Sequence, residues 1–313
     1  MLAQAVPDPF RFQAHPDVWL LVAALTASYI YMVRWVGPHA VAAGQQVVTR
    51  RNIWCFVGAM ALLWSASDWP IHDIGEGYLY SVHMLQHMML AYFLPPLALL
   101  ATPAWLLRVL VGTGRAYAVL KWFCKPVVAG VLFNLAVMVT HIPGVVNASV
   151  TSSSPVLHYL IHVMVVSTAF LMWMPVCGPF KEFHMGTGGK MIYLFLMSVV
   201  PTVPAGWLTF ADGAVYKAYD RPVRLWGISV TVDQQLAGAI MKTGGSIFLW
   251  AIIVTLWFTR FASSHGDEHN YRRGRAMPSA EIVGHDDDQL TYAAVEEEFA
   301  RVPAPDEPTR PAP

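Results

Sequence analysis

The sequence predicts an all-α fold: a polytopic membrane bundle of seven transmembrane helices, with the amino terminus outside and the carboxy terminus in the cytoplasm. Hydrophobic residues make up 56% of the 313 residues and charged residues only 13%, and the mean hydropathy is +0.45. Seven apolar runs approach the roughly 20 residues that a helix needs to cross a bilayer. Lys and Arg residues gather after alternate runs. This composition is typical of a membrane protein and excludes an ordinary soluble enzyme.

The apolar runs divide the chain into an outer amino-terminal segment, 1–16, a transmembrane domain, 17–261, and a tail, 262–313. The seven runs cover residues 17–36, 52–69, 78–102, 126–142, 155–176, 191–210 and 234–261. The tail holds 5 Lys and Arg against 11 Asp and Glu, so we expect it to be polar, acidic and disordered in the cytoplasm. The apolar runs make the lipid bilayer an expected partner. Because the chain has no basic patch with interleaved aromatic residues, we expect no nucleic acid as a partner.

The positions of the Lys and Arg residues decide the predicted orientation. Basic residues follow the first, third, fifth and seventh runs, among them Arg50, Arg108, Lys181 and Arg260. The segments between the second and third runs and between the fourth and fifth runs contain none. Since cytoplasmic loops carry the excess of Lys and Arg, this distribution predicts an outer amino terminus.

The third run carries two histidines four residues apart, His83 and His87. On a helix this spacing puts both imidazoles on one face, with Glu76 ahead of them on the same face. The fifth run repeats the spacing with His158 and His162. At about 1.5 Å per helical residue, both pairs lie at matched depths of roughly 8 and 14 Å below the outer surface. A polar stripe inside a membrane span is a functional-site hypothesis by default.

Two more histidines lie on the same side of the predicted bundle, His72 before the third run and His141 at the end of the fourth. Each of them alone is equally well explained as a hydrogen-bonded residue at the membrane interface. The two H-x3-H pairs are harder to explain by packing, because neutral imidazoles in hydrocarbon need partners. The loop histidines, among them His15, receive no role. The candidate metal ligands are therefore His83, His87, His158, His162, His72 and His141.

The ligand types favour copper without deciding the question. Imidazole suits copper, zinc, iron and nickel, and nearby thioethers favour copper(I). Met84 and Met88 lie beside the histidines of the third run and are candidate auxiliary ligands, although Met is also the usual filler of apolar gaps. Haem is the alternative, because one imidazole from the third run and one from the fifth could hold its iron.

Three other polar residues in or near the spans are candidate auxiliary groups: Glu76, Asp233 and Lys242. Lys242 is expected about 14 Å from the outer surface, level with His87. A Lys at that depth needs a carboxylate, backbone carbonyls or water, and Glu76 and Asp233 are the candidate carboxylates. We expect a structural ion pair there.

Three segments carry a family resemblance: HDIGEGYLYSVHMLQHMMLAYFLPPLALLATP, LHYLIHVMVVSTAFLMWMP and DQQLAGAIM. They resemble the seven-helix CtaG-type cytochrome c oxidase assembly factors that occur with caa-type oxidases, over about residues 50–260. The resemblance implies a role in forming the copper centres of the oxidase, with the six candidate histidines as metal-handling positions. Lys242 stands where the family carries aromatic residues, and the acidic tail lies outside the resemblance.

Together these observations predict a non-enzymatic assembly factor in a bacterial plasma membrane. Its copper site would face the periplasmic or extracellular side, and its partners would be cytochrome c oxidase subunits or a copper carrier. A haem-binding membrane redox protein, a metal transporter and a structural scaffold for oxidase subunits are the alternatives. Because the polar groups stop near mid-membrane, the sequence favours an outward site over a conduit.

Overall fold

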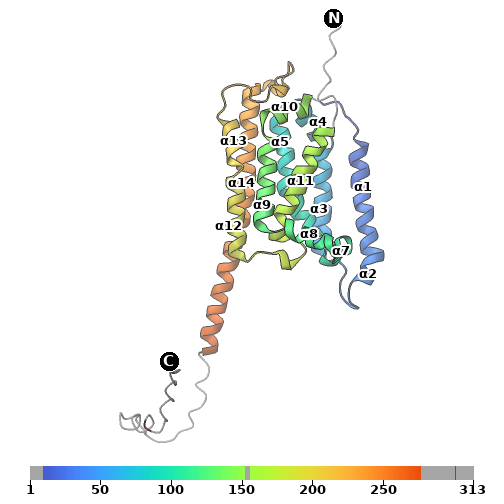
Figure 1. Ribbon diagram of the computed structural model, residues 1–313, viewed down its shortest axis with the longest axis vertical. Helices are drawn as coiled ribbons and strands as arrows, with labels where there is room; N and C mark the ends of the chain where they lie inside the picture. The colour runs from blue at the N-terminus through green and yellow to red at the C-terminus, as the bar shows by residue number, and fades with distance from the viewer. Residues whose placement is uncertain (1–9, 152–155, 276–299, 301–313) are drawn as a thin grey trace, which may run out of the picture. The chain divides into compact units, whose positions relative to one another are not determined.

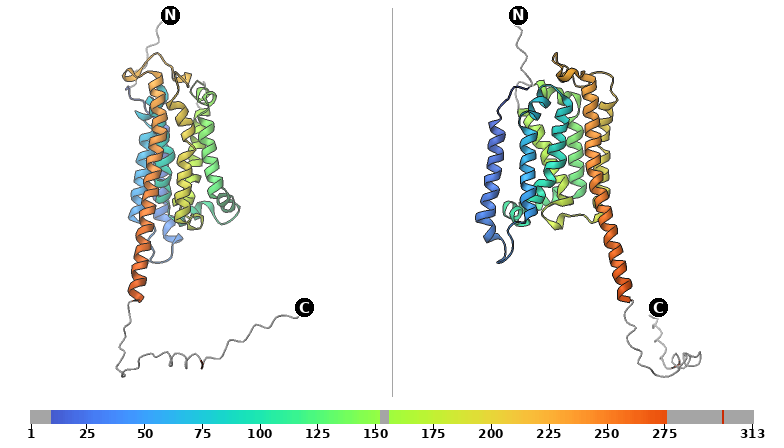
Figure 2. Two further views of the ribbon diagram at one scale, coloured as in Figure 1. Left: turned by 90° about the vertical axis from the view of Figure 1, so that its left-hand side faces the viewer. Right: turned by 180° about the vertical axis from the view of Figure 1, so that it is seen from behind.

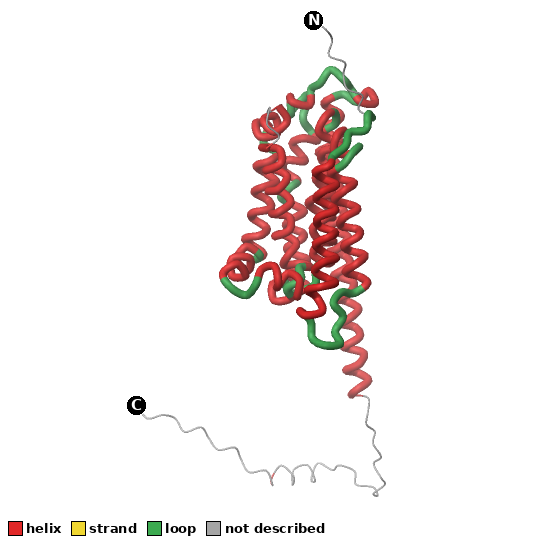
Figure 3. The backbone as a smooth tube through the Cα atoms, turned by 90° about the vertical axis from the view of Figure 1, so that its right-hand side faces the viewer, coloured by secondary structure: helices red, strands yellow, loops and turns green. Residues whose placement is uncertain are grey.

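The computed structural model describes residues 10–151, 156–275 and 300, and no strand occurs in these ranges (Figure 1, Figure 3). The predicted all-α fold is therefore confirmed. The chain divides into two compact units, Met1–Arg260 and Phe261–Pro313. Most of the predicted outer segment, 1–16, and of the predicted tail, 262–313, lies outside the described residues.

The helices follow one another along the chain with short connections. The first half contains α1 (Pro16–Tyr31), η1 (Met32–Val36), α2 (Gly37–Ala40), α3 (Arg50–Ser67), α4 (Ile71–Gly77), α5 (Tyr80–Met88), η2 (Met89–Phe93), α6 (Leu94–Ala101), α7 (Ala104–Val111), α8 (Arg115–Phe123) and α9 (Pro126–Thr140). The second half contains α10 (Pro143–Thr151), α11 (Val156–Cys177), η3 (Lys181–Phe183), α12 (Thr187–Val199), α13 (Thr202–Thr209), η4 (Lys217–Tyr219), η5 (Leu225–Gly227) and α14 (Val230–Arg275).

Among the described residues, five helical stretches are long and apolar enough to cross a membrane, and the pair α8 and α9, bent by 68°, would make a sixth. α3 occupies the second predicted span but starts with Arg50, Arg51 and Asn52, which shorten its apolar part. The structure thus supports a membrane protein, whereas seven spans and the orientation of the termini stay predictions. The five stretches are Pro16–Ala40, Tyr80–Ala101, Val156–Cys177, Thr187–Thr209 and Val230–Ala262.

The first helix lies at one edge of the bundle (Figure 1, Figure 2). α1 packs on α3 and has no fully buried residue. Deeper in the bundle, α6 packs against both α3 and α11, and α9 packs against α11. α1 therefore contributes no residue to the buried core.

Two prolines shape the helix that carries His83 and His87. α5 passes through the π-helical turn η2 into α6, which begins with Leu94, Pro95 and Pro96. Proline has no amide hydrogen, so the carbonyl of Ala91 loses its helical partner at Pro95. That carbonyl accepts a hydrogen bond from the Trp173 indole of α11 at 3.3 Å instead. The interruption thus holds α11 against α5 and α6.

The first turn of α5 is capped by a residue far away in the sequence. The Asp233 carboxylate, on α14, accepts hydrogen bonds from the amide of Tyr80 at 2.8 Å and from the amide of Ser81 at 3.0 Å. These amides are among the donors that every helix leaves without an internal partner at its start. A negative charge there also favours the helix dipole. Asp233 therefore fixes the turn from which His83 projects.

A buried aromatic cluster supports the same turn. The ring of Tyr80 lies 4.7 Å from that of Tyr216 and 4.9 Å from that of Tyr219, between ring centroids. All three tyrosines are 1% exposed. Met84 and Met241 also belong to this cluster. The cluster joins α5 to α14 and to the segment that precedes α14. The start of α5 is thus held by packing as well as by the cap.

Candidate metal site

Four histidines and one glutamate converge from three helices. Within α5 the ring centroids of His83 and His87 are 4.6 Å apart, and within α11 those of His158 and His162 are 4.4 Å apart. Between the helices, His87 and His162 approach to 4.8 Å. Each pair shares one helix face, and the two faces meet. We call Glu76, His83, His87, His158 and His162 the Glu–His cluster.

Glu76 joins the cluster from the short helix α4. Its Oε1 atom contacts Nε2 of His158 and lies 3.9 Å from Nδ1 of His83 and from Nε2 of His162. The close approach of α4 to α5 depends on Gly75, because a Cβ there would lie 3.0 Å from the backbone nitrogen of His83. The sequence indicated Glu76 only as an auxiliary group, but the structure puts its carboxylate between the two histidine pairs.

The charge state of Glu76 follows from these neighbours. Burial raises the pKa of the carboxyl, but the hydrogen bond with His158 and the nearby imidazoles of His83 and His72 outweigh burial and hold that pKa at about 2. Glu76 is therefore an anion at neutral pH. A partly buried carboxylate beside several imidazoles is a suitable partner for a cation.

The imidazoles of the cluster offer nitrogens that the protein itself leaves unused. Nδ1 of His83 and Nε2 of His87 and of His162 are buried, and none has a hydrogen-bond partner among the described residues. A buried polar atom without a partner costs about 1–3 kcal/mol. Such atoms in a native protein call for a partner from outside the chain, such as a water molecule or an ion.

Two overlapping groups of the cluster have the spacing of metal ligands. In one group His83, His87 and His162, and in the other Glu76, His158 and His162, offer ligand atoms that all lie within 4.8 Å of one another. Ligands about 2.0–2.1 Å from one ion stand up to about 4 Å apart, so small side-chain rotations would close either group around an ion. His162 belongs to both groups.

His72 lies in a second layer around the cluster. Its Nδ1 accepts a hydrogen bond from the Gln86 amide at 3.2 Å and lies 3.9 Å from the Glu76 carboxylate. The ring of His15 meets that of His72 edge-on at 5.1 Å, and Nε2 of His15 pairs with Asp73 at 3.0 Å. Sequence reasoning gave His15 no role, because it precedes α1 and only the fold brings it here.

His141 belongs to neither group of three, but it lines a small cavity together with the four histidines of the cluster. Its Nε2 faces the sulfur of Met84 at 3.4 Å, and its Nδ1 donates to the carbonyl of Val137 at 2.6 Å. Two small cavities of about 20 Å³ each are lined by Met84, His87 and His141, and one of them also by Met88. The candidate thioethers therefore surround His141 and His87 on one side of α5.

Asp233 and Lys242 do not reach the Glu–His cluster. The hydrogen bonds of Asp233 go to the start of α5, as described above. Lys242 donates to the hydroxyl of Thr202 at 2.5 Å and to the carbonyl of Ser198 at 3.4 Å. The predicted ion pair of Lys242 with Glu76 or Asp233 is therefore wrong. The break between α12 and α13 leaves helix-end oxygens near Lys242, and these satisfy the ammonium group instead.

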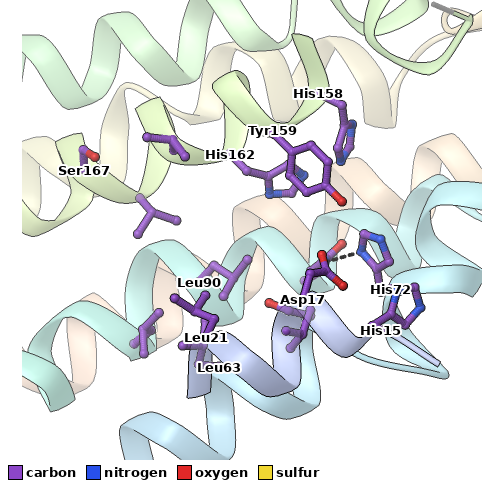
Figure 4. A pocket seen from close by; sticks show the side chains of 16 residues that line it. His15, Asp17, Leu21, Leu63, His72, Leu90, His158, Tyr159, His162 and Ser167 are labelled. Carbon is purple, nitrogen blue, oxygen red and sulfur yellow. Dashed lines mark hydrogen bonds between the residues drawn. The ribbon is translucent and has the colours of Figure 1, made fainter. Parts of the chain in front are cut away.

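A cavity of about 390 Å³ opens beside the cluster (Figure 4). Figure 4 shows His158, Tyr159 and His162 of α11 on one side and His15, Asp17 and His72 on the other. The rest of the lining is mostly apolar, with Ser67, Gln86 and Ser167 as its other polar residues. His83 and His87 do not line this cavity. The cluster thus has an outer side that a solute in the cavity can reach and an inner side that it cannot. The apolar lining residues include Leu21, Leu63, Leu90, Leu94, Val163 and Val166.

The fold and the site define a helical membrane protein with a largely buried cluster of four imidazoles and one carboxylate. The model of the cytochrome c oxidase caa3 assembly factor family matches residues 27–263, which is well over half of the chain, and the chain belongs to this family. The resemblance seen in the sequence is therefore confirmed. No curated protein and no solved structure matches the chain significantly.

Proposed function

We propose that this protein holds a copper ion at the Glu–His cluster and passes it on during formation of the copper centres of cytochrome c oxidase. The unused buried nitrogens of His83, His87 and His162 carry this proposal, because an ion would satisfy all three at once. Membership of the oxidase assembly factor family supports the biological role. The oxidase subunits, or a carrier that supplies the copper, are the partners.

The overlap of the two ligand groups supports stepwise transfer. Glu76, His158 and His162 form an outer position, because His158 and His162 line the large cavity. His83, His87 and His162 form an inner position, since His83 and His87 do not line that cavity. Nε2 of His162 has a single lone pair, so it binds one ion at a time. An ion can therefore keep His162 as a ligand while it exchanges Glu76 and His158 of the outer position for His83 and His87 of the inner position.

The ligand set favours copper over haem. Imidazole binds copper strongly, and the thioethers of Met84 and Met88 on the adjoining face favour the copper(I) state. A haem held between α5 and α11 would need a slot for its macrocycle between the rings of His87 and His162, whose centroids are 4.8 Å apart. A bare ion needs no such slot. The groups gathered here are metal ligands, and we propose a non-enzymatic role.

We further propose that the cluster faces the outside of a bacterial plasma membrane. α3 begins with Arg50 and Arg51 and ends close to α4, which carries Glu76. The basic residues and the cluster therefore belong to opposite ends of this helix. Because Lys and Arg favour the cytoplasmic side, this separation supports an outward site.

Metal content of the purified protein tests the proposal. The full chain in detergent would be exchanged with copper(I), washed and measured by mass spectrometry together with its absorption spectrum. We expect bound copper and no Soret band. The combined substitution His83→Ala and His162→Ala removes a ligand from each position and should abolish binding at the cluster. His39 is exposed and remote in sequence from the cluster, so His39→Ala is the matched control. A Soret band, or equal copper in both variants, would contradict the proposal.

A further inference from the structure

We propose that His141 and Met84 form a second, softer copper(I) position, which shares a small cavity with the histidines of the Glu–His cluster. The role of copper here rests on the proposed function, whereas the position itself rests on a separate pair of side chains. Both side chains are buried, with 7% of His141 and 2% of Met84 exposed. Neither belongs to the two groups of ligands described above.

The hydrogen bond at Nδ1 fixes the tautomer of His141. The carbonyl of Val137, 2.6 Å away, can only accept, so Nδ1 carries the hydrogen. Burial disfavours a charged imidazolium, and Nε2 therefore presents a free lone pair. A backbone carbonyl that accepts from the other ring nitrogen is also the usual arrangement around a metal-bound histidine.

The partner of that lone pair is another electron donor. The Met84 sulfur lies 3.4 Å from Nε2 of His141, and a thioether has no hydrogen to donate. Two buried lone pairs that face each other do not stabilise the fold. A nitrogen about 2.0 Å and a sulfur about 2.3 Å from one ion, at a tetrahedral angle, are about 3.5 Å apart. The observed spacing therefore suits two ligands of one soft ion.

The surroundings provide room and a third ligand. Two cavities of about 20 Å³ adjoin this pair; His87 lines both of them, and His83, His158 and His162 also line one. A volume of this size holds about one water-sized particle. Nε2 of His87 is among the buried nitrogens without a hydrogen-bond partner in the described part of the chain. His87 therefore stands between the inner position of the cluster and the His141–Met84 position.

The donor types separate the two positions chemically. The outer position includes the carboxylate of Glu76, a hard ligand that tolerates copper(II) and zinc. The second position pairs an imidazole with a thioether, which favours copper(I). Copper that moves from Glu76 toward Met84 thus passes from harder to softer ligands and is retained more strongly in the reduced state.

X-ray absorption at the copper edge, combined with copper content, tests this position. The full chain in detergent would be loaded without oxygen from tetrakis(acetonitrile)copper(I), and excess copper would be removed. We expect a copper–sulfur contribution in the parent. Met84→Leu should abolish it and lower the copper content by one ion per chain, and His141→Ala should do the same. Since Leu for Met is a volume-conserving exchange that costs below about 1.5 kcal/mol, Met84→Leu should remain folded, as its melting temperature would verify.

Two further variants separate this inference from the proposed function. Met164→Leu changes a methionine of α11 that is 37% exposed and should leave the sulfur signal intact. The combined His83→Ala and His162→Ala variant should lose the nitrogen-bound ion and keep the copper–sulfur signal. A parent that binds copper without sulfur, or a Met84→Leu variant that keeps the parent's sulfur signal, overturns the second position alone. The proposed cluster alone would be overturned if Met84→Leu abolished the copper–sulfur signal while the combined His83→Ala and His162→Ala variant kept the copper content of the parent.

Discussion

The hydroxyl of Ser81 donates a hydrogen bond to Oδ1 of Asp233 at 2.6 Å, and the same oxygen also accepts from the Ser81 amide at 3.0 Å. The two residues are 152 positions apart in the sequence. Their contact ties the last long helix, α14, to the first turn of α5. His83 follows within that turn, so the position of a candidate ligand depends on a carboxylate outside the Glu–His cluster.

Asp233→Ala should therefore destabilise the protein. It leaves the amides of Tyr80 and Ser81 buried without an acceptor, which costs about 1–3 kcal/mol for each unpaired group. Thermal unfolding in detergent would measure the loss. Asp233→Asn keeps one acceptor oxygen and should lie between Ala and the parent. An Ala variant as stable as the parent would show that the cap is dispensable.

Gly75→Ala should weaken copper binding through displacement of α4. The added Cβ would lie 3.0 Å from the backbone nitrogen of His83, so α4 and Glu76 must move away. Loss of alignment in the surroundings of metal ligands typically lowers affinity about 10–100-fold. Competition for copper(I) with a chelator of known affinity would measure the change.

Gly77→Ala is the matched control for that experiment. It lies on the same helix, and a Cβ there would meet no atom within 4 Å. Its copper affinity should equal that of the parent. If both alanine variants behaved alike, the close approach of α4 to His83 would have no part in ligand positioning.

Lys242→Met should change the copper affinity by less than about threefold. Loss of a residue that hydrogen-bonds to a metal ligand typically lowers metal affinity by about 10–100-fold. The ammonium group bonds to Thr202 and Ser198 and contacts no member of the Glu–His cluster in the described hydrogen bonds and ion pairs. The same chelator competition would measure the affinity. A tenfold change would mean that the charge of Lys242 acts on the site over a longer range.

Copper(I) should raise the melting temperature of the parent. An ion that binds the folded chain stabilises it by about 2.7 kcal/mol at a free concentration one hundred times its dissociation constant. The shift should disappear in the variant with both His83→Ala and His162→Ala, apart from the part contributed by the His141–Met84 position. An unchanged shift in that variant would place the bound copper elsewhere.

Helical periodicity was sufficient to predict the core of the candidate site. A spacing of four residues places His83 with His87 and His158 with His162, and the structure shows each pair on one face. The pairing of α5 with α11 followed from the matched depth of the two pairs. The spacing along a helix and the depth along a membrane span both follow from residue positions, so they can be predicted from the sequence.

Tertiary contacts were beyond such reasoning. Glu76 enters the cluster because Gly75 allows α4 to lie against α5, and His15 reaches His72 from a segment that precedes α1. Lys242 was assigned to carboxylates, whereas the break at the end of α12 offers it nearer oxygens. In each case the partner is chosen by packing between distant segments, which periodicity along one helix does not report.

The copper content of the oxidase itself tests the central claim most directly. A caa3-type oxidase would be purified from cells that carry the parent chain, the variant with His83→Ala and His162→Ala, or His39→Ala, and its copper would be measured relative to its haem. We predict full copper content with the parent and with His39→Ala, and copper-depleted oxidase with the cluster variant. Full copper content with the cluster variant, at an equal level of that protein in the membrane, would contradict the claim that the cluster delivers copper.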